Sequence, residues 1–210
     1  MSMATVNGFR AMPSASTAEA GKPKSAGHDF AGLVLAGGQS SRMGRDKAGL
    51  SLNGISLLDH AVETLRDAGA HPVLVSGNHP GHQCIPDKYP GRGPLGGLAS
   101  VISGRPTLAG SLLVVIPVDA PGLAAADLRR LAAGIEDAAG AHFEGHPLPM
   151  AVRVSDDLAT RVEQLLGGTG IASVRRLAGQ LDFRVLPRAQ ADLRNLNTPR
   201  DWDAFTGASP

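Results

Sequence analysis

The chain has 210 residues, of which 42% are hydrophobic and 19% charged, and its formal net charge is +1. This length suits one sizeable α/β domain, and the near-neutral charge argues against nucleic acid or an anionic membrane as a partner. No apolar run reaches the roughly 18 residues that a membrane span needs. The single cysteine, Cys84, excludes an internal disulfide framework and favours a cytoplasmic location.

The first 29 residues are rich in Ala, Ser, Pro, Gly and Lys and lack the apolar segment of a secretory signal. We expect them to form a flexible tail ahead of one domain over residues 30–210. From residue 30 onward, apolar runs alternate with helical patterns, which is typical of a parallel, doubly wound sheet. Strands are predicted at 32–37, 72–77, 83–87 and 111–119, and helices around 58–65, from Pro94 and around 128–135.

Beyond residue 140 the pattern changes. Residues 142–154 predict an antiparallel strand pair, and 183–187 a late strand. One helix is predicted around Leu158–Leu166 and another around Ile171–Ala178, while Asn197-Thr198-Pro199 is typical of the start of a last helix. The predicted fold is a single three-layer α/β/α Rossmann-like domain, with a mostly parallel sheet and an antiparallel addition.

The segment GGQSSRMGRDK (37–47) directly follows the first predicted strand. In an open α/β sheet, ligands bind beyond the carboxyl ends of strands, and glycine N–H groups with nearby basic side chains suit a phosphate. The segment matches neither the GxxxxGK[ST] phosphate loop nor the GxGxxG dinucleotide fingerprint. Taken alone, it leaves a solvated surface loop open as the alternative.

Four motifs in chain order carry a family resemblance. LAGGQSSRMGRDK resembles the signature loop of nucleotidyltransferases related to sugar-nucleotide pyrophosphorylases. PDKYPGRGPLGGL (86–98), IPVDAP (116–121) and RNLNTP (194–199) resemble motifs of the molybdenum cofactor guanylyltransferases of MobA type, with Val118 where cysteine is usual. The resemblance spans about residues 30–205. It implies transfer of GMP from GTP to the terminal phosphate of molybdenum-loaded molybdopterin, with release of pyrophosphate.

The resemblance also implies roles for individual residues. Lys47 and Arg42 would neutralise the triphosphate, and Asn195 and Asn197 would face the pterin. On the GTP side it places the following residues: Leu35, Ala36, Gly37, Gly38, Lys47, Asn78, Asp87 and Asp119. For Asn78 and Asp87, the residues alone equally favour positions in turns.

Asp119 ends the most apolar predicted strand, which directs it toward the same crevice as the glycine-rich segment. Mg²⁺ prefers one or two carboxylates together with phosphate oxygens, and we expect Asp119 to be its ligand. The alternative is an N-cap for the helix that follows. His142 and His146 have the spacing of a zinc pair on a helix, but Gly145 and Pro147 argue against a helix there.

Two other functions stay open. One is a sister nucleotidyltransferase, either a cytidylyltransferase for the same pterin or a sugar-phosphate nucleotidyltransferase, because base choice depends on few contacts. The other is a carrier that holds nucleotide or pterin without chemistry, although such a carrier would have no need of Lys47 or Asp119. As further partners we expect molybdoenzymes or cofactor chaperones that receive the product.

Overall fold

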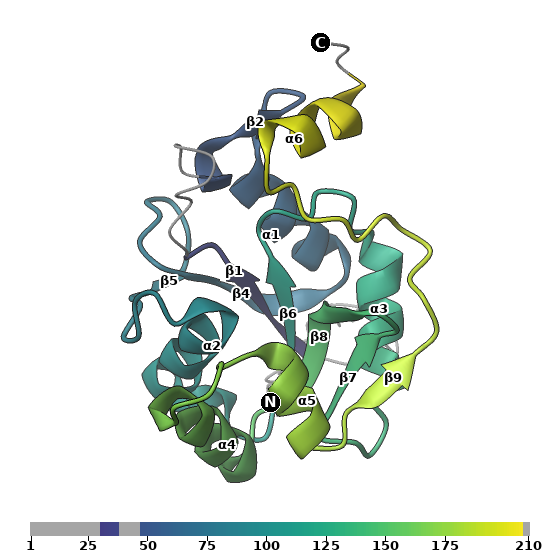
Figure 1. Cartoon of the computed structure of the whole chain (residues 1–210). Helices are drawn as coiled ribbons and strands as arrows, with labels where there is room; N and C mark the ends of the chain where they lie inside the picture. Colours follow the sequence, from purple (N-terminus) through teal and green to yellow (C-terminus); the bar gives the residue numbers. More distant parts are fainter. Residues whose placement is uncertain (1–29, 38–46, 208–210) are drawn as a thin grey trace, which may run out of the picture.

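A computed structural model describes residues 30–37 and 47–207 of the chain. The expected tail over residues 1–29 and the predicted site residues Gly38 and Arg42 lie outside this part. Within it, a seven-stranded sheet has the order β5-β4-β1-β6-β8-β7-β9 (Figure 1). The strands are β1 (Phe30–Leu35), β4 (Ala70–Ser76), β5 (Cys84–Ile85), β6 (Leu112–Pro117), β7 (Gly140–Phe143), β8 (His146–Arg153) and β9 (Arg184–Leu186).

The sheet is parallel except for β8, which runs antiparallel to both of its neighbours, β6 and β7. The predicted mostly parallel sheet with an antiparallel addition is therefore confirmed. The addition is the β7–β8 hairpin, and it places the remaining strand, β9, parallel to β7 at the far edge. The carboxyl ends of β1, β4 and β6 consequently meet at one edge of the sheet, the upper edge in Figure 1.

Helices cover both faces of the sheet. The helices α1 (Leu57–Asp67) and α3 (Ala125–Gly134) pack on one face, and α2 (Gly93–Gly104), α4 (Asp156–Gly167) and α5 (Val174–Gln180) on the other. Successive strand residues point to opposite faces, so Leu33 and Val34 of β1 belong to two different apolar clusters, one beneath each helix layer. This arrangement confirms the three layers. None of the described helices is both long and apolar enough to cross a membrane.

Side-chain caps begin several of these helices. Ser56 accepts a hydrogen bond from the Asp59 N–H at the start of α1, and Gly69, with a φ of +97°, follows its end. The last helix, α6 (Pro199–Thr206), begins with a reciprocal capping box between Thr198 and Asp201. This confirms the helix start predicted from Asn197-Thr198-Pro199. Figure 1 places α6 beyond the edge where the parallel strands end.

Two local features differ from the sequence predictions. A small hairpin of β2 (Ser51–Leu52) and β3 (Ile55–Ser56) was not predicted, although its turn residues, Asn53 and Gly54, both adopt the positive φ that an Asn-Gly turn favours. The prediction that Ile171 lies on the buried face of α5 is wrong. Its side chain is 85% exposed, because Ser173 caps the helix and α5 begins only at Val174.

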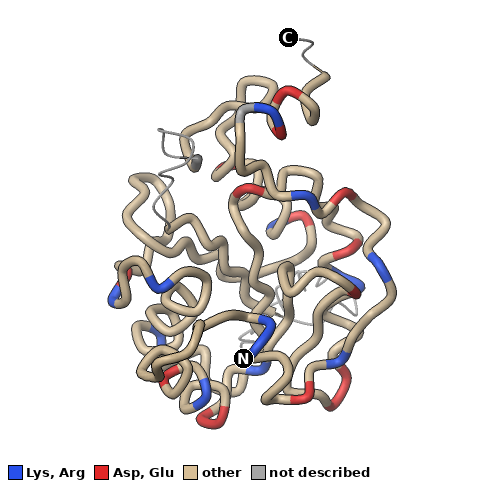
Figure 2. Tube along the Cα trace, in the orientation of Figure 1, with Lys and Arg blue, Asp and Glu red and all other residues tan. Residues whose placement is uncertain are grey.

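Charged residues are interspersed along the chain. In the view of Figure 2, Lys and Arg are mixed with Asp and Glu over the described residues, in line with the formal net charge of +1. Binding of an anionic ligand therefore has to depend on local groups rather than on a long-range field.

Candidate active site

The edge where the parallel strands end gathers most of the predicted site residues. The end of β1 lies beside the end of β6, where Leu35 is in register with Pro117 and the Val118 N–H donates to the Leu35 carbonyl at 3.2 Å. On its other side β1 pairs with β4, which ends at Ser76. The segments that follow these three strands therefore leave the sheet side by side, as the crevice prediction requires.

The Ser76 side chain binds the two backbone N–H groups that directly follow β1. Its hydroxyl oxygen is 3.1 Å from the Ala36 nitrogen and 3.3 Å from the Gly37 nitrogen, and it accepts a hydrogen bond from each. Ser76 is 2% exposed, so its position is fixed by the surrounding core. These two N–H groups are thus directed toward Ser76. Sequence analysis missed this residue and named Asn78 instead, an exposed side chain two positions further along.

Asp87 lies beside the same turn. A Cβ atom at Gly37 would be 3.7 Å from the Ser76 hydroxyl oxygen and 3.8 Å from Asp87 Oδ2. The structure therefore brings Gly37 and Asp87 together, although they are 50 positions apart in the sequence. At these distances a Cβ would make ordinary van der Waals contacts, so Gly37 lies directly against both oxygens.

The carboxylate of Asp87 is held by a backbone N–H and by the hydroxyl of a buried serine. Its Oδ1 accepts from the Tyr89 N–H at 2.8 Å and lies 3.2 Å from the hydroxyl of Ser100, a fully buried residue of α2. The same hydroxyl accepts from the Lys88 N–H at 2.9 Å. Asp87 is thus a turn residue, as one interpretation of the sequence held, while its Oδ2 faces Gly37.

Two glycines of α2 allow this helix to pack closely under the site. A Cβ at Gly97 would lie 2.8 Å from a methyl carbon of Leu35, and one at Gly96 would lie 2.7 Å from the Tyr89 carbonyl oxygen. Real Cβ atoms do not approach that closely, so a side chain at Gly96 would displace backbone and one at Gly97 would displace the Leu35 side chain. The repeated glycines of GPLGGL therefore set the distance between α2, β1 and the Asp87 turn.

Asp119 follows β6 and is half-buried. Its carbonyl oxygen accepts from the Leu196 N–H at 2.7 Å, which places the segment around Leu196 directly against it. The alternative that Asp119 caps the following helix is wrong, because α3 begins after Ala124 and has no side-chain cap.

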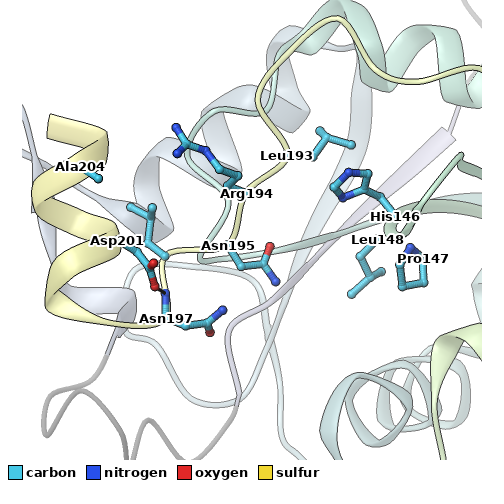
Figure 3. A pocket seen from close by; sticks show the side chains of 10 residues that line it. His146, Pro147, Leu148, Leu193, Arg194, Asn195, Asn197, Asp201 and Ala204 are labelled. Atoms are coloured by element: carbon cyan, nitrogen blue, oxygen red, sulfur yellow. Dashed lines mark hydrogen bonds between the residues drawn. The ribbon is translucent and has the colours of Figure 1, made fainter. Parts of the chain in front are cut away.

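The two predicted pterin-side residues line a cavity of about 450 Å³ at this place. Figure 3 shows Asn195 and Asn197 on the segment that leads into α6, with His146 across the cavity and Asp201 on α6. The Asn197 N–H donates to Asp201 Oδ2 at 3.0 Å. His142 lies on β7 and His146 at the start of β8, so the helical spacing of a zinc pair does not apply to them. The remaining lining residues are Pro147, Leu148, Leu193, Arg194, Leu196 and Ala204.

Lys47 begins the short 3-10 helix η1 (Lys47–Gly49), and its side chain lies outside the described part of the chain. Taken together, the structure groups Leu35, Ala36, Gly37 and Asp87 on one side of the crevice and Asp119, Asn195 and Asn197 on the other. The first group follows β1 and β5, and the second combines the residue near the end of β6 with two residues that line the cavity.

The comparisons with known proteins agree with this architecture. A family described as the MobA-like NTP transferase domain matches residues 32–185. The chain belongs to the MobA-like NTP transferase family. The resemblance drawn from the four motifs is thereby confirmed.

Similar members of the MobA-like family include a molybdenum cofactor guanylyltransferase of Xanthomonas euvesicatoria, 41% identical over 86% of this chain and 96% of the relative. A probable molybdenum cofactor guanylyltransferase of Opitutus terrae is 33% identical over 83% of this chain and 93% of the relative.

Among solved structures, molybdopterin-guanine dinucleotide biosynthesis protein A of Archaeoglobus fulgidus superposes with a TM-score of 0.68, covering 85% of this chain and 97% of the other at 18% identity. A 2-C-methyl-D-erythritol 4-phosphate cytidylyltransferase of Thermus thermophilus gives 0.63 at 15% identity, covering 83% and 96%. These two likenesses show the shared nucleotidyltransferase fold.

Proposed function

We propose that this chain transfers GMP from GTP to molybdenum-loaded molybdopterin, forming the guanine dinucleotide of the cofactor and releasing pyrophosphate. Support comes from two relatives named as guanylyltransferases, which the chain matches over most of their length. The structural observation that carries the proposal is the crevice with two subsites. It joins the Gly37–Asp87 side to the Asn195–Asn197 cavity through Asp119.

The chemistry joins two anions. A phosphate oxygen of the acceptor forms a bond to the α-phosphorus of GTP, while the bond between that phosphorus and the bridging oxygen of the β-phosphate breaks. Such a reaction depends on neutralising charge and on in-line placement, and it needs no covalent nucleophile of the protein. We assign GTP to the Gly37–Asp87 side, with Gly38, Arg42 and Lys47 around its phosphates, and the acceptor to the cavity.

Base recognition belongs to the same side of the crevice. The backbone of Leu35, Ala36 and Gly37 would meet the guanine, with Asn78 as a further donor and acceptor at its edge. Because Ser76 already accepts from Ala36 and Gly37, the conformation of this backbone is set before the nucleotide arrives. A preformed turn would lower the ordering cost of binding.

Asp119 is the residue we assign to a Mg²⁺ ion. Its half-buried carboxylate group follows the central strand β6 between the two subsites, and Mg²⁺ is commonly held by one or two carboxylates plus phosphate oxygens. Over residues 30–37 and 47–207, no three acidic, His or Cys side chains gather into a metal site. When bound, the ion would supply positive charge to the triphosphate.

The proposed setting follows from the substrates. GTP and loaded molybdopterin would be drawn from the cytoplasm, and a molybdoenzyme or a cofactor chaperone would receive the product. One solved structure with this fold is a cytidylyltransferase, so the fold alone does not determine which nucleotide is used. Guanine preference is therefore part of the proposal.

The proposed roles can be tested by replacing Lys47 and Asp119 separately. Lys47→Ala should lose about 2–4 kcal/mol of transition-state stabilisation, as loss of one preorganised charge or donor typically does. Asp119→Asn should abolish Mg²⁺-dependent GMP transfer while the protein stays folded. Asp157→Asn, a 64%-exposed carboxylate on α4, is the matched control. Near-normal transfer by both variants would remove this assignment.

A further inference from the structure

The segment between β9 and α6 forms an extended strap over residues 187–198. In Figure 1 it runs from β9 along α3 to α6, and it is neither helix nor strand. The strap carries Asn195 and Asn197 and thus one wall of the cavity. An extended segment has few hydrogen bonds of its own, so its position depends on the groups that hold it.

Asp127, in the first turn of α3, anchors the strap by two hydrogen bonds. Its Oδ1 accepts from the Gln190 N–H at 3.1 Å and its Oδ2 from the Ala191 N–H at 2.9 Å. Asp127 is 3% exposed, and a buried carboxylate is costly unless its oxygens are satisfied. Here both oxygens are satisfied by the strap. The bonds span 63 and 64 positions of sequence, so they join two distant parts of the chain.

Arg130 adds a second connection one turn further along α3. Its guanidinium lies 3.6 Å from Asp127 Oδ1 and donates to the Arg188 carbonyl at 2.7 Å. It also donates to the carbonyl of Pro187. The beginning of the strap is therefore fixed through its N–H groups by Asp127 and through its carbonyls by Arg130.

The strap also touches the loop that carries Asp119, at two places. The Leu196 N–H donates to the Asp119 carbonyl at 2.7 Å. A Cβ at Gly122 would collide with the Asp192 carbonyl, so strap and loop are in close backbone contact there. Because α3 directly continues this loop, Asp127 and Asp119 belong to one continuous segment of the chain. The two bonds of Asp127 thus fix the strap relative to Asp119.

We infer that Asp127 is a positioning residue for the acceptor substrate. By holding the strap on α3, it keeps Asn195 and Asn197 at the distance from Asp119 that the reaction needs. The identity of the acceptor, molybdenum-loaded molybdopterin, rests on the proposed function. It does not require Asp127 to touch either substrate.

The test compares Asp127→Asn and Asp127→Ala with the unaltered chain. Asparagine keeps the shape of the side chain but turns an NH₂ group toward one of the two strap N–H groups, while alanine removes both acceptors. For loaded molybdopterin, KM should rise roughly tenfold to hundredfold, the factor that corresponds to one charge-assisted hydrogen bond. Calorimetric GTP affinity should be unchanged. Amide hydrogen exchange at Gln190 and Ala191 should be faster in both variants.

Leu158→Ala is the control for a general loss of stability, since Leu158 is buried in the core on the other face of the sheet. It should lower the melting temperature without raising KM for the acceptor. An unchanged acceptor KM in Asp127→Ala, or equal losses for GTP and acceptor, would overturn the inference. So would unchanged exchange at Gln190 and Ala191. If the unaltered chain transfers no GMP, the proposed function is wrong. The amide hydrogen exchange rates at Gln190 and Ala191 then still show whether Asp127 holds the strap in place.

Discussion

Replacement of Gly96 by alanine probes how α2 supports the nucleotide side of the crevice. The added methyl group would lie 2.7 Å from the Tyr89 carbonyl oxygen and 3.0 Å from the Arg92 Cβ atom. Ordinary contact begins at 3.4 Å, so the turn around Tyr89 has to move by roughly 0.7 Å (3.4 minus 2.7). The colliding atom belongs to the backbone and cannot rotate away.

The magnitude follows from two opposing effects. Overpacking of this kind costs about 1–3 kcal/mol, whereas alanine gains about 1 kcal/mol over glycine in a helix interior. Because backbone has to move, we expect the upper part of the first range and a net loss of about 1–2 kcal/mol in unfolding free energy. The Tyr89 N–H donates to Asp87 at 2.8 Å, so the displacement should also weaken GTP binding.

The expected losses of stability and of GTP affinity can be measured by chemical denaturation and by GTP calorimetry. Both measurements are made on Gly96→Ala and on a control variant, Gly179→Ala. Gly179 is an exposed position inside α5, and a Cβ there meets nothing within 4 Å. Gly179→Ala should therefore gain about 0.4–1 kcal/mol and bind GTP normally. The argument is refuted if Gly96→Ala is as stable as Gly179→Ala and binds GTP equally well.

Two further predictions concern single polar groups. Ser76→Ala should cost about 1–3 kcal/mol in unfolding free energy and lower GTP affinity, because the N–H groups of Ala36 and Gly37 lose their acceptor; denaturation and calorimetry measure both, and unchanged values would contradict it. The hydrogen-bonded guanidinium of Arg194 lowers the pKa of Asp192 below its ordinary 3.8, so its carboxylate stabilises the fold above that pH and this contribution is lost as the pH falls through the folded pKa. Thermal denaturation of Asp192→Asn should therefore show a small deficit at neutral pH that disappears under strongly acidic conditions, and a deficit that grows below pH 3.8 would contradict the sign.

The layers of the fold could be predicted because they follow from local periodicity. Alternating apolar residues such as Leu33 and Val34 fill the two cores, and helical stripes such as that around Leu58 lie over them. The β2–β3 hairpin was missed although Asn53-Gly54 signals such a turn, because its strands are only two residues long. Ile171 was misplaced because an apolar spacing was extended past the capping serine of α5.

The site was predictable to the extent that motifs mark it. Motif resemblance named Asp87 and Asn195, and the structure places Asp87 beside Gly37 and Asn195 in the wall of the cavity. Ser76 and Asp127 carry no comparable signal, since a serine at a strand end and an aspartate in a first helical turn are ordinary. Their importance comes from bonds to residues 39 or more positions away, which only the folded chain brings together.

The central claim, a guanylyltransferase site at the end of β1, is tested most directly by calorimetry of GTP, CTP, ATP and UTP, each with and without Mg²⁺. The account predicts that GTP binds in preference to the other three and that Mg²⁺ strengthens its binding. A preference for CTP would contradict the guanine assignment and place the chain among cytidylyltransferases of the same fold. Binding of no nucleotide would contradict the assignment of this crevice altogether.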